Sequence, residues 1–446
     1  MTNSPPNAPS EDTPSPEAVS SDEGVEADSQ AHRVAAWAPF RFPDYRLFWF
    51  GSVAAMFTNQ LVVLALTVGL FEVTHSATQL GLLGAIRLAV QIPGLLWGGT
   101  LADEMDRKRL MAVTQGVTAA VLGVVAVLAV SGSLDAWHIF AATGVLSASV
   151  VLGQPARAAL TAVVVPRTHL LHAVTANTFT QQVGSIVAPI MFALVYKLWG
   201  INAAFVVTAF TAIPSAIMPM MIKADGKPVG VTVRGNMPTR VWEGFQYVRG
   251  HGILPGLFIL DIGMTVFTFY RDLLPALANG LFGGGATEVS WLTSSNSIGA
   301  VVGAAAVVFT ARYRAKGMLV VYVTIAFSVF VFLFGSVPSF WLGMVVIFGM
   351  GAFDAVSMTT RQAMMQLTTP DQMLGRTLSL GSLVATTANN FGTMWVGFLA
   401  GGIALGGIEF GGLGEARTMQ LGGILALLCT LVVWWAMRGL REYRYP

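Results

Sequence analysis

Residues 79–109 read QLGLLGAIRLAVQIPGLLWGGTLADEMDRKR, an apolar run that ends in a short, strongly charged turn. The apolar part is about 20 residues long, which is the length that a helix needs to cross the hydrocarbon core of a membrane. The turn ends in Arg107, Lys108 and Arg109, and basic residues gather in the cytoplasmic loops of membrane proteins. The stretch therefore predicts a transmembrane helix followed by a cytoplasmic loop.

The composition of the whole chain indicates the same class of protein. Of its 446 residues, 54% are hydrophobic and only 11% are charged, whereas a soluble domain carries about 25% charged residues. A water-facing surface on such a chain would hold too few charges to keep the protein dispersed. The composition therefore excludes a soluble protein and indicates a polytopic membrane protein.

Apolar runs of similar length follow one another along the rest of the chain. We expect an all-α membrane protein with twelve transmembrane helices in two six-helix halves. The predicted helices of the first half are 46–72, 79–101, 109–131, 137–159, 171–198 and 201–222. Those of the second half are 253–279, 288–311, 317–336, 340–366, 373–404 and 418–437.

Four regions are predicted along the chain. Residues 1–32 hold seven acids and no Lys or Arg, and they have too few large apolar side chains to fold on their own. The predicted regions are a disordered acidic tail over 1–36, an N-terminal half over 37–222, a polar cytoplasmic linker over 223–252 and a C-terminal half over 253–446.

The Lys and Arg residues predict the orientation of the chain in the membrane. The twelve-helix map places 21 of the 25 Lys and Arg residues on the side that holds both termini and the linker. Because basic loops stay in the cytoplasm, we expect both termini and the linker to be cytoplasmic.

The charged turn also resembles a loop signature of the major facilitator superfamily, Gly-x-Leu-Ala-Asp-Arg-x-Gly-Arg-Arg. The matching residues are Gly99, Leu101, Ala102, Asp103, Arg107 and Lys108. Asp106 replaces the second glycine of the signature, as is typical of the branch of bacterial exporters similar to the enterobactin exporter. Segments 154–177 and 366–376 are similar to the same branch. The resemblance covers all twelve predicted helices, and it implies a transporter whose halves rock around a central site.

The same turn predicts a conformational latch. Asp103 closes the helix at the membrane surface, and Arg107 lies four residues further on, where it can pair with the carboxylate. Such a contact acts as a latch when one state makes it and another breaks it. The alternative is that the basic residues only mark the cytoplasmic side. The predicted latch residues are Gly99, Asp103, Arg107, Lys108 and Arg376.

Helix 171–198 contains a candidate hinge. Gly184, Ala188 and Pro189 are similar to an exporter motif, Gly-x-x-x-Gly-Pro, with Ala188 in place of its second glycine. Small residues four apart let helices approach closely, and a proline removes one backbone hydrogen bond. These residues predict a gate hinge between the halves, with ordinary helix packing as the alternative.

Charged side chains within the predicted spans are informative, because each one costs about 2.5–3.5 kcal/mol at the centre of a membrane helix. Asp261 and Asp272 share one stripe of helix 253–279, and the resemblance implies that this helix lines the cavity. The proton-coupling candidates are Asp261, Asp354, Arg87 and Asp272. We expect Asp261 or Asp354 to carry the driving proton. The alternative is a structural carboxylate paired with Arg87 or Arg361.

Uncharged polar side chains also recur within the spans. Amides and hydroxyls in a membrane helix can bind a substrate or can hydrogen-bond neighbouring helices together, and both interpretations stay open. The candidates for the substrate lining are Asn59, Gln60, Gln154, Asn177, Gln181 and Asn389.

Motifs of other protein classes are absent from the sequence. It contains no Gly-x-x-x-x-Gly-Lys-Ser/Thr loop, no Gly-x-Ser-x-Gly and no His-Glu-x-x-His, and its single cysteine is Cys429. We therefore expect no enzyme activity, no cofactor, no metal site and no nucleic-acid partner. An ion gradient remains as the energy source.

These observations predict a monomeric, proton-coupled secondary transporter in the lipid bilayer of the bacterial inner membrane. We expect it to export an amphipathic small molecule, such as a siderophore or a drug, by alternating access. The alternatives are a lipid or metabolite carrier of the same fold and a membrane receptor or scaffold that has lost transport.

Overall fold

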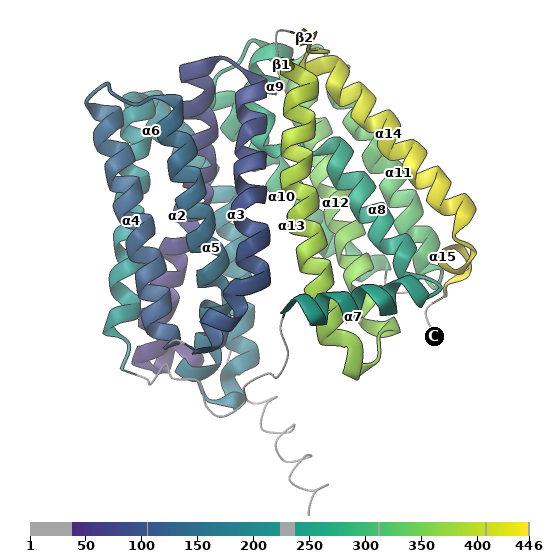
Figure 1. The fold of residues 1–446 in the computed structure, drawn as a ribbon, viewed down its shortest axis with the longest axis horizontal. Helices are drawn as coiled ribbons and strands as arrows, with labels where there is room; N and C mark the ends of the chain where they lie inside the picture. The colour runs from purple at the N-terminus through teal and green to yellow at the C-terminus, as the bar shows by residue number, and fades with distance from the viewer. Residues whose placement is uncertain (1–37, 105, 224–236, 311–312, 406–407, 445–446) are drawn as a thin grey trace, which may run out of the picture.

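The computed structural model describes residues 38–444 except 105, 224–236, 311–312 and 406–407. The predicted acidic tail and residues 224–236 of the predicted linker therefore lie outside the described residues. The described part is almost entirely helical (Figure 1).

The N-terminal half is built from five α-helices and two short 3-10 helices. Their bounds are η1 (Ala38–Arg41), α2 (Pro43–Thr74), α3 (Ala77–Glu104), α4 (Arg107–Val130), α5 (Ala136–Val164), η2 (Arg167–His169) and α6 (Leu170–Met221).

The linker ends in α7 (Met237–Gly250), which leads into the C-terminal half. That half comprises α8 (Leu254–Thr268), η3 (Arg271–Leu273), α9 (Leu274–Phe282), α10 (Ala286–Thr310), α11 (Lys316–Phe334), α12 (Phe340–Thr368), α13 (Asp371–Gly401), β1 (Gly402–Leu405), β2 (Ile408–Gly411), α14 (Glu415–Ala436) and α15 (Arg438–Glu442).

Helix α6 supplies two membrane spans. It has 52 residues, and at 1.5 Å per residue such a helix would be more than twice as long as the roughly 30 Å hydrocarbon core. The chain turns back at Gly200, whose φ of 78° and ψ of −175° are non-helical. Glycine adopts a positive φ without a steric penalty, so one residue separates the two spans.

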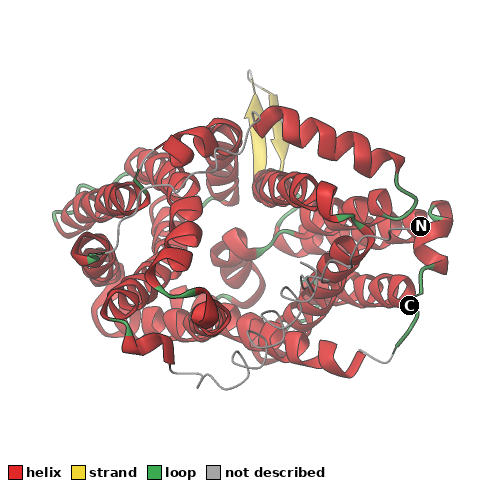
Figure 2. Ribbon diagram, turned by 90° about the horizontal axis from the view of Figure 1, so that it is seen from below, coloured by secondary structure: helices red, strands yellow, loops and turns green. Residues whose placement is uncertain are grey.

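The remaining spans complete the predicted twelve. Among the described residues, nine helices, α6 included, are long and apolar enough to cross a membrane. The segment from α8 to α9 adds a further span. Helix α13 has 31 residues, enough to cross, although it carries more polar side chains. With α6 counted twice, twelve spans result, in two groups of six (Figure 2).

Two local predictions were wrong, and one segment holds a helix that was not predicted. The predicted helix 253–279 is broken, because α8 ends at Thr268 and α9 begins at Leu274, next to Pro275, which lacks the backbone N–H that a continuous helix needs. The predicted helix 373–404 ends at Gly401, where a two-stranded antiparallel hairpin of β1 and β2 begins. The polar linker contains an amphipathic helix, α7, which is bent by 108° from the chain that follows it.

The two ends of the molecule differ in how the halves meet. We call them the α7 end and the hairpin end, after α7 and the β1–β2 hairpin, which lie at opposite ends in Figure 1. Near the hairpin end, one buried apolar cluster contains residues of both halves, such as Leu70 and Leu274. Near the α7 end, the described residues form two separate clusters, one around Tyr45 and one around Leu257. The halves are therefore packed together at the hairpin end and apart at the α7 end.

Two helix pairs join the halves, α3 with α13 and α6 with α10. The α3–α13 contact is close because it is lined with glycine. A methyl group on Gly84 would overlap the carbonyl oxygen of Asn390, and one on Gly397 would lie 2.5 Å from the Cα of Gly81. Larger side chains at these positions would force the two helices apart.

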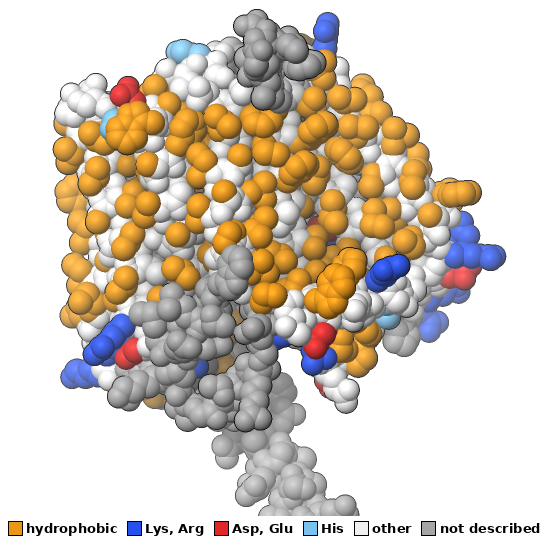
Figure 3. Space-filling view, in the orientation of Figure 1, with side chains coloured by type: hydrophobic (Ala, Val, Ile, Leu, Met, Phe, Trp, Pro, Cys, Tyr) orange, Lys and Arg blue, Asp and Glu red, His pale blue; other side chains and the backbone are white. Residues whose placement is uncertain are grey.

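The outer surface is that of a membrane protein. Hydrophobic side chains cover the broad middle band in Figure 3, and Lys and Arg side chains gather along the lower edge, at the α7 end. Phe309, Trp341 and Trp435 are among the most exposed large apolar residues. An apolar surface of this extent is stable in lipid but not in water.

Candidate functional site

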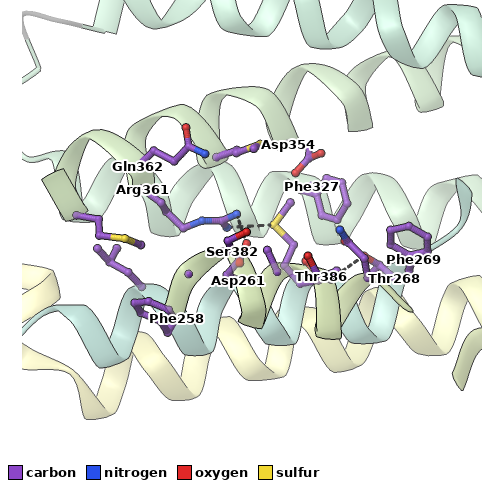
Figure 4. Close-up of a pocket in the computed structure, with 18 of the residues that line it drawn as sticks. Phe258, Asp261, Thr268, Phe269, Phe327, Asp354, Arg361, Gln362, Ser382 and Thr386 are labelled. Atoms are coloured by element: carbon purple, nitrogen blue, oxygen red, sulfur yellow. Dashed lines mark hydrogen bonds and ion pairs between the residues drawn. The ribbon is translucent and has the colours of Figure 1, made fainter. Parts of the chain in front are cut away.

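A cavity of about 550 Å³ lies within the C-terminal half. Its walls come from α8, α12 and α13, with Phe327 contributed by α11. The lining combines aromatic and thioether side chains with two carboxylates and two guanidinium groups (Figure 4). The charged members are Asp261, Arg271, Asp354 and Arg361.

Asp261 and Arg361 form an ion pair across this cavity, from α8 to α12, with Nη2 and Oδ1 2.6 Å apart. Figure 4 shows the two side chains pointing toward each other. Arg361 is 8% exposed, and it also donates a hydrogen bond of 3.0 Å to the Ser357 hydroxyl. Because the guanidinium is almost fully buried, these partners offset the cost of removing its charge from water.

Asp354 and Arg271 form a looser pair in the same cavity. Their nearest atoms are 3.5 Å apart, and the side chains are 31% and 54% exposed. An exposed pair of this length contributes little to stability. Asp354 is therefore the more loosely paired of the two carboxylates that line the cavity.

Asp272 and Arg87 join the two halves near the hairpin end. Arg87 Nη1 on α3 lies 2.5 Å from Asp272 Oδ2 on η3, and the side chains are 15% and 5% exposed. The Thr393 hydroxyl of α13 donates a hydrogen bond of 2.9 Å to the same oxygen. Of the ion pairs among the described residues, this is the one that links the N-terminal half to the C-terminal half.

A hydrogen bond beside this pair extends the contact between α3 and α13. The amide of Asn390 donates to the side-chain oxygen of Gln91 at 2.8 Å. Thr78, at the start of α3, donates to the carbonyl oxygen of Gly402 at 2.7 Å. Separating α3 from the C-terminal half thus requires the loss of an ion pair to η3, of a hydrogen bond to α13 and of a hydrogen bond to β1.

A second cavity, of about 290 Å³, lies within the N-terminal half and is walled by α2, α4, α5 and α6. Four of the residues predicted to line a substrate site lie here, namely Asn59, Gln60, Gln154 and Gln181. Of the other two, Asn389 lines the C-terminal cavity. Asn177 lines neither cavity, and its buried Oδ1 has no hydrogen-bond partner among the described residues.

Arg157 lines the N-terminal cavity, although the sequence interpretation counted it among the cytoplasmic loop cations. Arg157 is near the end of the predicted helix 137–159, and because α5 continues to Val164, it lies well within the observed helix. Pro166 marked this boundary, because a helix usually ends before the residue that precedes a proline. Arg361 was likewise counted with the cytoplasmic cations, although it belongs to the predicted helix 340–366, and it lies within α12.

The predicted latch is only partly described. Gly99 belongs to α3, and its surroundings and the side chain of Asp103 lie outside the described residues. Lys108 Nζ donates to the Ile222 carbonyl oxygen at 2.9 Å, which ties the start of α4 to the end of α6. Arg376 Nε lies 2.8 Å from Glu243 Oε2 and so connects α13 to α7. Arg107 is the first residue of α4.

The hinge candidates lie on α6 where it packs against α10. The Ser294 hydroxyl of α10 donates to the Ile186 carbonyl oxygen at 3.4 Å, between Gly184 and Ala188. Pro189 does not interrupt the helix, because Gly200 is the residue of α6 with non-helical dihedral angles. Ile186 thus lies at the second contact between the halves, whereas Gly184 packs against Met56 of α2, within the N-terminal half.

Two six-helix halves, packed together at one end and each holding a polar cavity, make up the major facilitator fold. The chain belongs to the family described as transmembrane secretion effector, whose model matches residues 34–443. Its fold and family make it a transporter and not an enzyme.

Bacterial exporters resemble the chain over most of its length. The enterobactin exporter EntS of Shigella boydii serotype 18 is 26% identical over 389 residues, which cover 84% of this chain and 86% of the exporter. The enterobactin exporter EntS of Escherichia coli O157:H7 has the same identity and coverage.

Solved structures share the fold. The nucleoside transporter NupG superposes with a TM-score of 0.70 at 11% identity and covers 90% of this chain and 100% of its own. A POT family transporter in complex with 5-aminolevulinic acid has a TM-score of 0.69 at 11% identity, over 90% and 97% of the two chains. The D-xylose-proton symporter has a TM-score of 0.62 at 14% identity, over 87% and 96%.

Proposed function

We propose that this chain is a proton-coupled exporter that moves an amphipathic small molecule out of the bacterial cell by alternating access. The observation that carries the proposal is the buried Arg87–Asp272 pair, because it links the two halves at the hairpin end. A contact of this kind differs between the states of a two-state machine, and a proton on Asp272 would change its strength. The relatives support export, since they are enterobactin exporters.

The orientation follows from the basic residues. Lys and Arg side chains gather at the α7 end in Figure 3, and basic residues favour the cytoplasmic side. We place both termini and α7 in the cytoplasm and the hairpin end outside the inner membrane. The described state then faces the cytoplasm, because the halves share one apolar core only near the hairpin end.

The coupling step uses opposite charges that meet and part. When the hairpin end opens, Asp272 leaves Arg87, faces the outside and takes up a proton. When that end closes, the guanidinium returns to Asp272 and favours its charged form, so the proton is released toward the cavity. Asp354 and Asp261 face that cavity, and we assign them to the onward path of the proton. The protein carries out these steps as a monomer.

The test uses protein reconstituted in proteoliposomes with a controlled pH gradient, with enterobactin, the substrate of the relatives, as the transported molecule. Asp272→Asn keeps the size of the side chain and an acceptor for the Thr393 hydroxyl, but it cannot titrate. We expect it to abolish uphill, pH-driven transport and to retain downhill exchange. Glu442→Gln is the matched control, because Glu442 belongs to an exposed ion pair.

The contrary outcomes are distinct. Full pH-driven transport by Asp272→Asn removes Asp272 as the coupling residue. A loss of folded protein, without a specific loss of coupling, assigns the pair to structure, because an unpaired buried arginine destabilises the fold. The variant Arg87→Gln/Asp272→Asn separates these cases, since it leaves no buried charge and still lacks the titrating group.

A further inference from the structure

The N-terminal cavity has an unbalanced charge. Arg157 lines it, and no Asp or Glu lies among its lining residues. None of the ion pairs among the described residues includes Arg157. No side-chain hydrogen bond of Arg157 to another described residue is present either, although a guanidinium offers five N–H donors.

The polar groups around Arg157 are mostly amides. Gln154 lies three residues before it, on the same face of α5, and Asn59 and Gln60 approach from α2 and Gln181 from α6. Within the described part of the chain, none of these four amides makes a side-chain hydrogen bond to another residue. Amides both donate and accept, so the cavity offers one fixed positive charge surrounded by free hydrogen-bonding groups.

The C-terminal cavity is balanced by comparison. Its two carboxylates, Asp261 and Asp354, each have a guanidinium partner in the same cavity. The remaining lining includes Phe258, Phe269 and Met358, which favour an apolar or aromatic group. The two cavities together therefore carry a net positive charge, and this charge comes from Arg157.

We infer that the transported molecule is an organic oxyanion, whose planar anionic group, such as a carboxylate, binds Arg157 and the amides of the N-terminal cavity while its apolar or aromatic part occupies the C-terminal cavity. The inference rests on the proposed transport function and specifies its substrate class. A planar oxyanion suits Arg157, because a guanidinium binds it through two parallel hydrogen bonds. A lipophilic cation is disfavoured, because it would meet an uncompensated positive charge.

The test compares two probes of nearly equal shape, 2-naphthoate and the neutral 2-naphthamide. Binding to the purified full-length protein is measured by titration calorimetry at neutral pH. We expect naphthoate to bind wild-type protein at least about tenfold more tightly, because its carboxylate forms charge-assisted hydrogen bonds with Arg157 that the neutral amide cannot form. Arg157→Gln should abolish this preference, and Arg157→Lys should keep part of it. The exposed Arg438→Gln is the matched control, since Arg438 lies outside both cavities.

The result that overturns the inference is equal binding of the two probes by wild-type protein, or an unchanged preference for naphthoate in Arg157→Gln. The proposed function fails separately. If Arg157→Gln loses the preference and wild-type protein shows no pH-driven transport, the anion site stands and proton coupling does not. If pH-driven transport is present and naphthoate has no advantage, the coupling stands and the substrate class is wrong.

Discussion

The N-terminal and C-terminal cavities occupy similar six-helix halves, yet their linings differ in kind. The first is small, rich in amides and contains Arg157 without a carboxylate, whereas the second is larger and lined by aromatic residues and by two acid–arginine pairs. Such a difference teaches that a repeated fold does not repeat its chemistry. Each half can evolve its own lining because its helices pack mainly within that half, and among the described residues the halves meet mainly through α3–α13 and α6–α10.

The largest effect is expected at the pair that joins the halves. Asp272→Leu should destabilise the protein by about 3–5 kcal/mol, because it leaves Arg87 buried and unpaired. Adding Arg87→Leu should recover most of this loss. Asp354→Leu should change stability by less than about 1 kcal/mol, since its pair within the C-terminal half is partly exposed. Unfolding in detergent by denaturant measures all three, and equal losses for Asp272→Leu and Asp354→Leu would contradict the distinction.

The second effect concerns how closely the halves approach. Gly84→Leu should separate α3 from α13 and shift the protein toward a state that is open at the hairpin end. Replacing Cys429, the single cysteine, by alanine and placing a cysteine at the buried Ala400 allows labelling by a water-soluble thiol reagent.

In this background, labelling should become at least about tenfold faster in Gly84→Leu, which corresponds to a shift of about 1.4 kcal/mol. Gly123→Leu is the matched control, because a side chain there would meet nothing within 4 Å. Similar labelling of the two variants would show that the glycine contact does not hold the hairpin end closed.

The third effect separates the roles of the two cavities. Gln181→Leu should weaken naphthoate binding by about 0.5–1.5 kcal/mol, the usual contribution of one hydrogen bond, and should reduce the preference for naphthoate over naphthamide. Phe269→Leu should weaken the binding of naphthoate and of naphthamide to the same extent, because it removes an aromatic contact but no polar contact. The titrations described for Arg157 measure both, and a change in preference caused by Phe269→Leu would break the division between the cavities.

The smallest effect is expected where α7 meets α13. Glu243 and Arg376 are 40% and 41% exposed, so Glu243→Gln should change the unfolding free energy by less than about 1 kcal/mol. Transport should remain near the wild-type rate. A severe loss of transport at unchanged stability would give the α7 contact a role in the cycle that its exposure does not predict.

The twelve spans could be predicted from the sequence because each apolar run is long enough to cross the membrane and charged residues punctuate the runs. The local backbone exceptions were harder to predict. The break in the seventh span lies next to Pro275, but the proline alone did not predict it. Helix α7 was not predicted because the sequence around Trp242 is polar, and its amphipathic pattern extends over only 14 residues.

The pairing of charges could not be predicted from one sequence. Asp272 and Arg87 are 185 residues apart. The sequence around either residue does not indicate which residue it pairs with. The stripe that contains Asp261 and Asp272 suggested one shared face, but the break after Thr268 separates them into a cavity residue and a residue at the contact between the halves. Arg157 was missed because it lies near the end of the predicted helix 137–159 and was counted with the basic residues of the cytoplasmic side.

The turn at Gly200 also has a mechanical consequence. A single residue joins the two membrane spans of α6, so neither span can move far without the other. A longer loop would allow each span to move independently. When contact with α10 moves the first span of α6, the second span is therefore displaced with it. The N-terminal half then moves as one rigid body. A short Gly-Ser insertion after Gly200 should loosen this turn and slow transport at unchanged membrane insertion.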